Sequence, residues 1–143
     1  MTVMNLDKLV VWCAARDFAT VIYKQVVPLL PPTEKYNLVD QLKRAAVSIP
    51  ANIAEGHGRY YYQDNVCFCY IARGSLTEIQ SHLLLAKELG FVTPQVYANV
   101  TSEAEAVVRA INGWIVYLKK SKIGANEPGP PPASSMKTNQ NTP

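Results

Sequence analysis

The chain has 143 residues, of which 48% are hydrophobic and 17% are charged. This length and composition are typical of a globular protein with one core. The net charge of +3 permits a nucleic-acid or other anionic partner without requiring one. No apolar run approaches the roughly 18 residues of a membrane-spanning helix and no charged leader precedes one, which excludes a membrane protein and predicts a cytoplasmic one. Three cysteines, an odd number, favour reduced thiols over a disulfide framework.

The first predicted helix covers about residues 6–30. Its apolar residues recur at spacings of three and four, as on one face of an amphipathic helix. These residues are Trp12, Ala15, Ala19, Ile22, Val26 and Leu30. The prolines of residues 28–32 end this helix, because proline removes a backbone donor and disfavours helix in the preceding residue.

The second predicted helix begins after Thr33, whose hydroxyl we expect to act as the N-cap, and ends near Gly56 or Gly58. Pro50 lies inside this helix, which predicts a kink or a local break. The alternative is that Pro50 occupies the first turn of a separate short helix.

Five polar residues of the second helix share one side of it, at spacings of four, four, three and four. They are Arg44, Ser48, Asn52, Glu55 and Arg59. An apolar stripe lies directly beside them and consists of Leu38, Leu42, Ala45, Ile49 and Ile53. Polar residues at the edge of a core predict a hydrogen-bonded network that joins two helices.

The third predicted helix begins at Gln63 or Asp64 and stops at Gly90. The fourth follows the cap Thr93 and the first-turn Pro94, and ends at lysines that suit the negative end of the helix dipole. The residues of the third helix expected to face inward are Phe68, Ala72, Ser75, Ile79, Leu83 and Ala86. Those of the fourth helix are Val96, Val100, Ala104, Val107, Ile111, Trp114 and Leu118.

No segment is typical of a strand, so the predicted fold is all-α, an up-down-up-down four-helix bundle over residues 1–122. Residues 123–143 are rich in proline, serine and asparagine, which predicts a disordered tail.

The third helix has a second apolar stripe opposite its predicted core face. A four-helix bundle has no central helix to bury two such faces, and the charged fraction is low for a monomer. We therefore predict a subunit interface formed by Val66, Tyr70, Thr77 and Leu84.

Three segments, at residues 41–59, 71–78 and 85–92, read QLKRAAVSIPANIAEGHGR, IARGSLTE and LAKELGFV. With these motifs the chain resembles, from residue 6 to residue 118, the four-helix bundle proteins encoded by intervening sequences of large-subunit ribosomal RNA genes. The resemblance implies a homopentamer, a ring with a central channel. It also implies kinship with the accessory variability proteins of diversity-generating retroelements, which are similar in fold and bind a reverse transcriptase and nucleic acid.

Two groups of residues could carry catalysis: Glu55, His57 and Arg59, and the pair Glu78 and His82 at i and i+4. The sequence offers no activated nucleophile, no glycine-rich phosphate loop and no third metal ligand at a useful spacing. We therefore predict a protein that is not an enzyme, with no metal and no cofactor. The polar residues serve structure in this interpretation, with Arg44 or Arg59 reaching Glu78 while Asn52 and Ser75 complete the polar contacts.

Aromatic rings interleaved with cations are typical of single-stranded nucleic-acid sites. Residues 60–62 are three tyrosines next to Arg59, although a loop of this kind also packs against helix ends or a neighbouring subunit. The residues predicted to bind nucleic acid are Tyr61, Lys43, Arg73, Lys119, Lys120 and Lys122. For the cations, ordinary solvated positions are the alternative.

The predicted function is a homo-oligomeric scaffold that binds RNA or DNA and a partner enzyme, with a retroelement reverse transcriptase as the implied enzyme. The alternative is a structural or protein-interaction bundle of the intervening-sequence type that does not bind nucleic acid directly.

Overall fold

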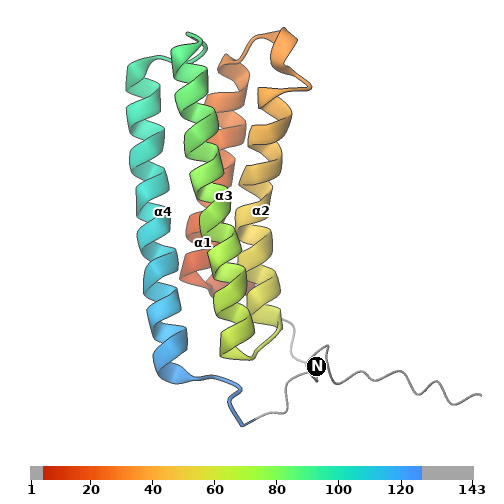
Figure 1. Ribbon diagram of the computed structural model, residues 1–143, viewed down its shortest axis with the longest axis vertical. Coiled ribbons are helices and arrows are strands. Elements are labelled where there is room, and N and C mark those ends of the chain that lie inside the picture. The colour runs from red at the N-terminus through yellow and green to blue at the C-terminus, as the bar shows by residue number, and fades with distance from the viewer. Residues whose placement is uncertain (1–4, 127–143) are drawn as a thin grey trace, which may run out of the picture.

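The computed structural model describes residues 5–126, and four antiparallel helices surround one core (Figure 1). The helices are α1 (Val10–Val21), α2 (Leu38–Gly58), α3 (Tyr62–Glu88) and α4 (Pro94–Ser121). Each helix contacts the next along the chain, α1 also contacts α4, and the contact between α2 and α3 is the most extensive. No strand occurs in residues 5–126, so the predicted all-α bundle is confirmed.

The apolar stripe predicted for α2 forms the centre of the core. All five of its residues are buried, and four of them, Leu42, Ala45, Ile49 and Ile53, have no exposed surface. On α3 and α4 the largest aliphatic side chains that are almost completely buried are Leu76, Ile79, Leu83, Ile111 and Leu118. Phe68, Val96 and Trp114 are only partly buried, at the edges of the predicted faces.

The first helix differs from its prediction. The α-helical part ends at Val21, continues as a π-helical turn over Ile22–Val26, and closes with a 3-10 turn over Val27–Leu29. A π turn holds more residues than an α turn, so Ile22, Val26 and Leu30, each four apart, can all be buried. Earlier in the helix the buried face is rotated by one residue. Val11 and Phe18 face the core, while Trp12 and Ala19 lie at its edge.

The beginning of α2 also differs from its prediction. Thr33 lies within a 3-10 turn formed by Pro32–Glu34, and α2 begins five residues later, at Leu38. The Glu34 carboxylate takes over part of the capping role, because its Oε2 accepts a hydrogen bond of 3.3 Å from the backbone N–H of Leu38.

The predicted interruption at Pro50 does not break α2, which is continuous from Leu38 to Gly58. Ile49 and Ile53, on either side of Pro50, are fully buried. Their packing holds the helix together although proline cannot donate the helical hydrogen bond of its own turn.

The end of the bundle that holds the α2–α3 loop is closed by the residues that follow α4. Lys122 ends the helix in the left-handed region, and the backbone N–H of Tyr62 donates to the carbonyl of Ile123 at 2.9 Å. The predicted tail begins at residue 123, but Ile123 and Gly124 lie against this loop. The rest of the predicted tail, residues 127–143, lies outside the described residues.

At the opposite end, the predicted cap of α4 is confirmed, since Thr93 Oγ1 accepts a 3.2 Å hydrogen bond from the backbone N–H of Val96. Within the described part of the chain, no helix combines the length and apolar character that crossing a membrane requires.

Candidate nucleic-acid interface

An ion pair joins α2 to α3. Arg44 Nη2 lies 2.5 Å from Glu78 Oε1 and 2.6 Å from Gln41 Oε1. The same Glu78 oxygen lies 3.3 Å from Nε2 of His82, one turn further along α3. Arg44 and Arg59 are the alternative partners predicted for Glu78, and the structure brings Arg44 to it.

The pKa of Glu78 is set by opposing influences. Desolvation by burial raises the pKa, but hydrogen bonds from Arg44 and His82, and the attraction of their positive charges, outweigh it and hold the pKa below its ordinary value. Glu78 is therefore ionised at neutral pH. A general acid at that pH needs a raised pKa instead, so this geometry belongs to a structural ion pair.

A second polar contact between α2 and α3 is made by neutral groups. The hydroxyls of Ser48 and Ser75 are 2.8 Å apart, and Asn52 Nδ2 donates to the backbone oxygen of Ser48 at 2.8 Å and to its hydroxyl at 3.0 Å. Ser75 is 9% exposed, and its hydroxyl has a partner. The network thus satisfies a buried polar group, as such groups require.

Glu55 and Arg59 do not extend this network to α3. Their side chains pair with each other at 3.6 Å and both are about half exposed. The Arg59 guanidinium instead lies 5.1 Å from the ring centroid of Phe68. His57, the third member of the candidate catalytic group, faces the ring of Trp114 with 6.3 Å between centroids.

Where α3 faces α4, cations surround an aromatic ring. The Tyr70 side chain is 40% exposed. Arg73 lies 5.0 Å from its ring centroid and Lys119, from α4, lies 5.7 Å from it. Arg73 is also held in place by α4, because its Nη1 donates a 2.9 Å hydrogen bond to Asn112 Oδ1. An exposed ring can stack on a base of a nucleic acid, and cations beside the ring can contact the phosphates of the same strand.

A groove of about 440 Å³ continues from Arg73 along the line between α3 and α4. It is lined by Arg73, Thr77, Gln80, Glu105, Val108 and Arg109. In residues 5–126 no carboxylate lies within ion-pair distance of Arg73, Arg109 or Lys119. These positive charges are therefore available to an anionic partner.

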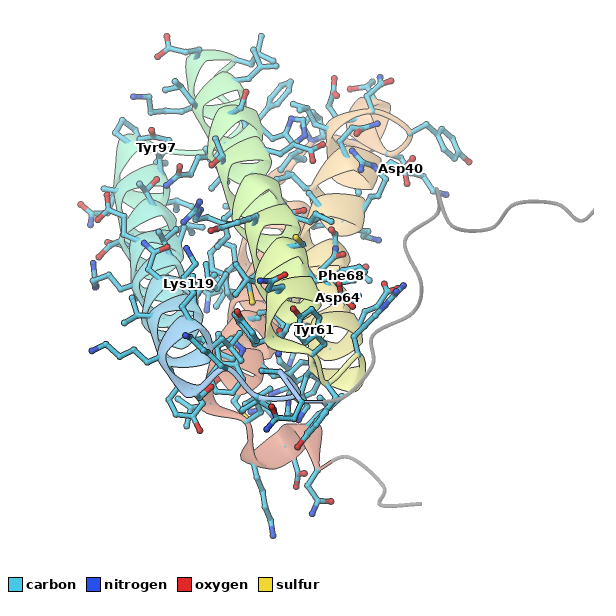
Figure 2. The ribbon with its side chains drawn as sticks, turned by 60° about the horizontal axis from the view of Figure 1, so that its bottom comes forward. Asp40, Tyr61, Asp64, Phe68, Tyr97 and Lys119 are labelled. Carbon is cyan, nitrogen blue, oxygen red and sulfur yellow. The ribbon has the colours of Figure 1, made fainter. Side chains whose placement is uncertain are left out.

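Three further predicted binding residues lie at the closed end of the bundle. Lys120 and Lys122 are exposed there, and Tyr61 is half-buried with its ring edge against Tyr62, 5.2 Å between centroids. Figure 2, in which this end comes forward, shows Tyr61 and Lys119 toward it and Asp40 and Tyr97 toward the other end. Tyr60, next to Tyr61, is 54% exposed.

Comparison with known proteins identifies the family. The family model of the 23S rRNA-intervening sequence protein matches residues 7–113. The chain belongs to this family. Among curated proteins, none matches the chain.

A solved structure of similar fold comes from Bacteroides thetaiotaomicron. It is the crystal structure of a protein of unknown function from the S23 ribosomal protein family, with a TM-score of 0.67 and 22% sequence identity. The alignment covers 74% of the present chain and 98% of that one. At this identity the likeness concerns the fold alone.

One residue chosen from the sequence, Val66, lies elsewhere than expected, and Lys43 lies at a distance from the other predicted cations. Lys43 lies near the start of α2, with its Nζ 5.4 Å from the ring of Tyr23, and so is apart from the other predicted cations. Val66 is 6% exposed and belongs to the core, so it cannot line an exposed stripe. The exposed apolar residues of α3 are Tyr70 (40%), Ile71 (51%), Leu84 (44%) and Leu85 (49%), and Thr77 is exposed beside them.

Arg109 was not among the residues selected from the sequence, although its spacing from other residues of α4 indicates a shared face. Arg109, Asn112, Val116 and Lys119 follow one another at intervals of three, four and three, which places them on one face of α4. That face meets Arg73 and Tyr70 of α3.

Proposed function

We propose that this protein is a non-enzymatic, homo-oligomeric scaffold that binds nucleic acid along the α3–α4 face. The observation that carries the proposal is Tyr70, an exposed ring between Arg73 and Lys119, neither of which has a carboxylate partner within residues 5–126. The ring offers a stacking platform for a base, and the cations offer contacts to phosphates.

Assembly strengthens this binding. One chain carries a net charge of +3, so a pentamer carries about +15, a sizeable field for attracting a polyanion. Each protomer contributes a few phosphate contacts, and their repetition on one particle raises the overall affinity through multivalency.

The interface between copies is formed by Leu84 and Leu85 of α3, which leaves the ring of Tyr70 exposed for nucleic acid. Leu84 and Leu85 are consecutive residues that are 44% and 49% exposed. Light scattering should give a particle several times heavier than the 15.8 kDa chain. Leu84→Glu with Leu85→Glu should shift it toward the monomer, whereas Val10→Glu, at a 79% exposed position on α1, should not. A wild type that is monomeric at micromolar concentration would end this part of the proposal.

The partner enzyme in this proposal is a reverse transcriptase, which the sequence resemblance to retroelement accessory proteins supports. A reverse-transcriptase gene beside the gene for this chain, and co-purification of the two proteins after nuclease treatment, are the expected results. A gene within a ribosomal RNA operon and no co-purification would favour a bundle of the intervening-sequence type without that partner.

The decisive experiment measures binding of labelled oligonucleotides by fluorescence anisotropy at two salt concentrations. The test variant replaces Arg73, Lys119, Lys120 and Lys122 with Gln. A control variant replaces Arg16, Lys24, Lys35 and Lys43, also one arginine and three lysines, which lie on or next to α1 and α2. The test variant should lose most of its affinity and of its salt dependence. For single strands, each phosphate contact lowers the binding constant by about 0.7 log units for every tenfold rise in salt concentration. The control variant should bind nearly as wild type does.

Equal losses of affinity in both variants would show that only net charge matters. If the assembled wild type does not bind oligonucleotides even at low salt, the protein is a scaffold that recognises protein only.

A further inference from the structure

A small enclosed space lies between the helices at the closed end of the bundle, apart from the α3–α4 groove. Its volume is about 60 Å³. It is lined by His57, Tyr60, Asn65, Trp114, Leu118 and Ile123, so α2, α3, α4, the α2–α3 loop and the turn after α4 all contribute to it.

The space contains a buried donor that the protein does not satisfy. Trp114 Nε1 is fully buried and has no hydrogen-bond acceptor among the described residues. A buried donor left in this state costs about 1–3 kcal/mol, and native structures rarely leave one without a partner.

Asn65 offers a second polar group to the same space. Its side chain is almost completely buried. Its Oδ1 is directed toward Cys69, whose Sγ donates to it at 3.7 Å, and toward Gly56, where an added Cβ would lie 2.8 Å from this oxygen. The NH2 group of Asn65 is therefore left for another acceptor.

The two segments that close the space hold unusual backbone conformations. Tyr60 has a φ of 65° and Lys122 a φ of 48°, backbone angles that residues other than glycine rarely adopt. Gly124, with a φ of 77°, lets the turn approach the loop, because a Cβ there would lie 3.1 Å from the Tyr61 Cα. Strain of this kind persists where the surrounding contacts fix it, and here the contacts of Gly124 and Ile123 with the loop hold the two segments together.

We propose that this space is a water-binding site in which one or two water molecules accept the Trp114 N–H and connect it to His57 and Asn65. A water molecule occupies about 30 Å³ in the liquid and needs two to four polar partners, and the space provides both the volume and three such groups. No charged side chain other than the titratable His57 lines it, so an ion would lose its hydration without a fixed countercharge.

The site has a consequence for the surface above it. The ring of Trp114 stacks on Tyr117, with 5.2 Å between centroids and 20° between planes, and Tyr117 is 52% exposed. Water that orients the indole of Trp114 therefore also orients an exposed ring at the end of the bundle.

Water NOE and ROE spectra of the full chain, labelled on tryptophan, test the proposal. The indole N–H of Trp114 should show a cross-peak to a long-lived water, and that of Trp12, which lies outside this space, should not. A crystal structure at high resolution should place a water within about 3.2 Å of Trp114 Nε1. A Trp114 indole without a water cross-peak, together with an empty space in the electron density, would overturn the proposal.

Variants identify the groups that hold the water. His57→Phe and Asn65→Leu each remove one polar partner and should each weaken the Trp114 water cross-peak, with the indole signal itself showing that the variant is folded. A cross-peak of wild-type intensity in both folded variants would overturn the assignment of these two partners.

Discussion

Where α3 faces α2, its carboxylate Glu78 is held by Arg44 and His82, whereas where α3 faces α4, the cations Arg73 and Lys119 gather around Tyr70 without a carboxylate. Both sides carry charged residues on the same helix. On the α2 side the charges neutralise each other inside one chain, and on the α4 side they do not.

This difference predicts that the charges on the two sides of α3 have different roles. A paired charge contributes modestly to stability and leaves little field for a partner. Charges of one sign around an exposed ring contribute little to stability and create a surface that attracts an anion. Substitutions on the α2 side should therefore change the free energy of unfolding, and substitutions on the α4 side should change binding.

Tyr70→Ala should have the largest effect of the single changes considered. If the ring stacks on a base, its loss costs about 1–3 kcal/mol of binding free energy, roughly 5- to 150-fold in affinity for single strands. Tyr23→Ala is the matched control, because Tyr23 is 41% exposed and also has a cation over its ring, but lies between α1 and α2. Anisotropy with single-stranded oligonucleotides measures both, and equal losses in the two variants would contradict the comparison.

Gly56→Ala should destabilise the fold by about 1–2 kcal/mol, because overpacking outweighs the gain in helix propensity. A Cβ at this position would lie 2.8 Å from both Asn65 Oδ1 and the Cβ of Phe68. Gly113→Ala on α4 is the control, since nothing lies within 4 Å of its Cβ, and it should stabilise by about 0.5–1 kcal/mol. Urea unfolding measures both changes, and a Gly56→Ala protein as stable as wild type would show that α2 and α3 can separate at little cost.

Glu78→Ala should destabilise by about 1 kcal/mol, a value reduced from that of a buried charged hydrogen bond because the Glu78 side chain is 35% exposed. Because folding lowers the pKa of Glu78, its contribution is fully present above the ordinary value of 4.5 and is lost as the pH falls through the lower pKa of the folded state. Urea unfolding at several pH values should thus show the difference from wild type shrinking below pH 4.5.

The control for Glu78 is Glu55→Ala, which removes an ion pair of 3.6 Å between half-exposed side chains. It should change stability by no more than about 0.5 kcal/mol. Losses of equal size at Glu55 and Glu78 would remove the distinction between the network and a solvated pair.

Arg73→Gln should have the smallest effect on stability, below about 0.5 kcal/mol, because it removes one hydrogen bond at the surface. Arg44→Gln, on the other side of α3, should cost about 1 kcal/mol, since it leaves Glu78 without its main partner. Thermal or urea unfolding of the two variants gives the comparison directly, and a larger loss at Arg73 would reverse the roles assigned to the two sides.

Features governed by local sequence could be predicted. The Thr93 cap and the buried stripe of α2 follow from the chemistry of one turn and from the period of one helix. The link between Arg44 and Glu78 could be anticipated as one of two alternatives, because consecutive antiparallel helices with a short loop must pack side by side.

Features that depend on how helices are placed against each other could not be predicted. Helix α3 has two apolar stripes, and only its packing decides that Val66 is buried while Tyr70 is exposed. The meeting of Tyr70 with Lys119 depends on the register of α3 against α4, and the separation of Lys43 from the other cations depends on its facing α1. A sequence pattern can select such residues as candidates, but it does not predict which of them lie close together in the folded protein.

The hydrogen bond from the Tyr62 N–H to the Ile123 carbonyl also limits where the protein can be truncated or fused to another sequence. The first N–H groups of a helix have no partner within that helix, and here α3 obtains one from a residue beyond the end of α4. A protein shortened to Ser121, or fused there to a tag or fluorophore, would lose that acceptor and the turn that covers the loop. A junction placed after Asn126 would keep both, and would be the better design for labelling this end of the bundle.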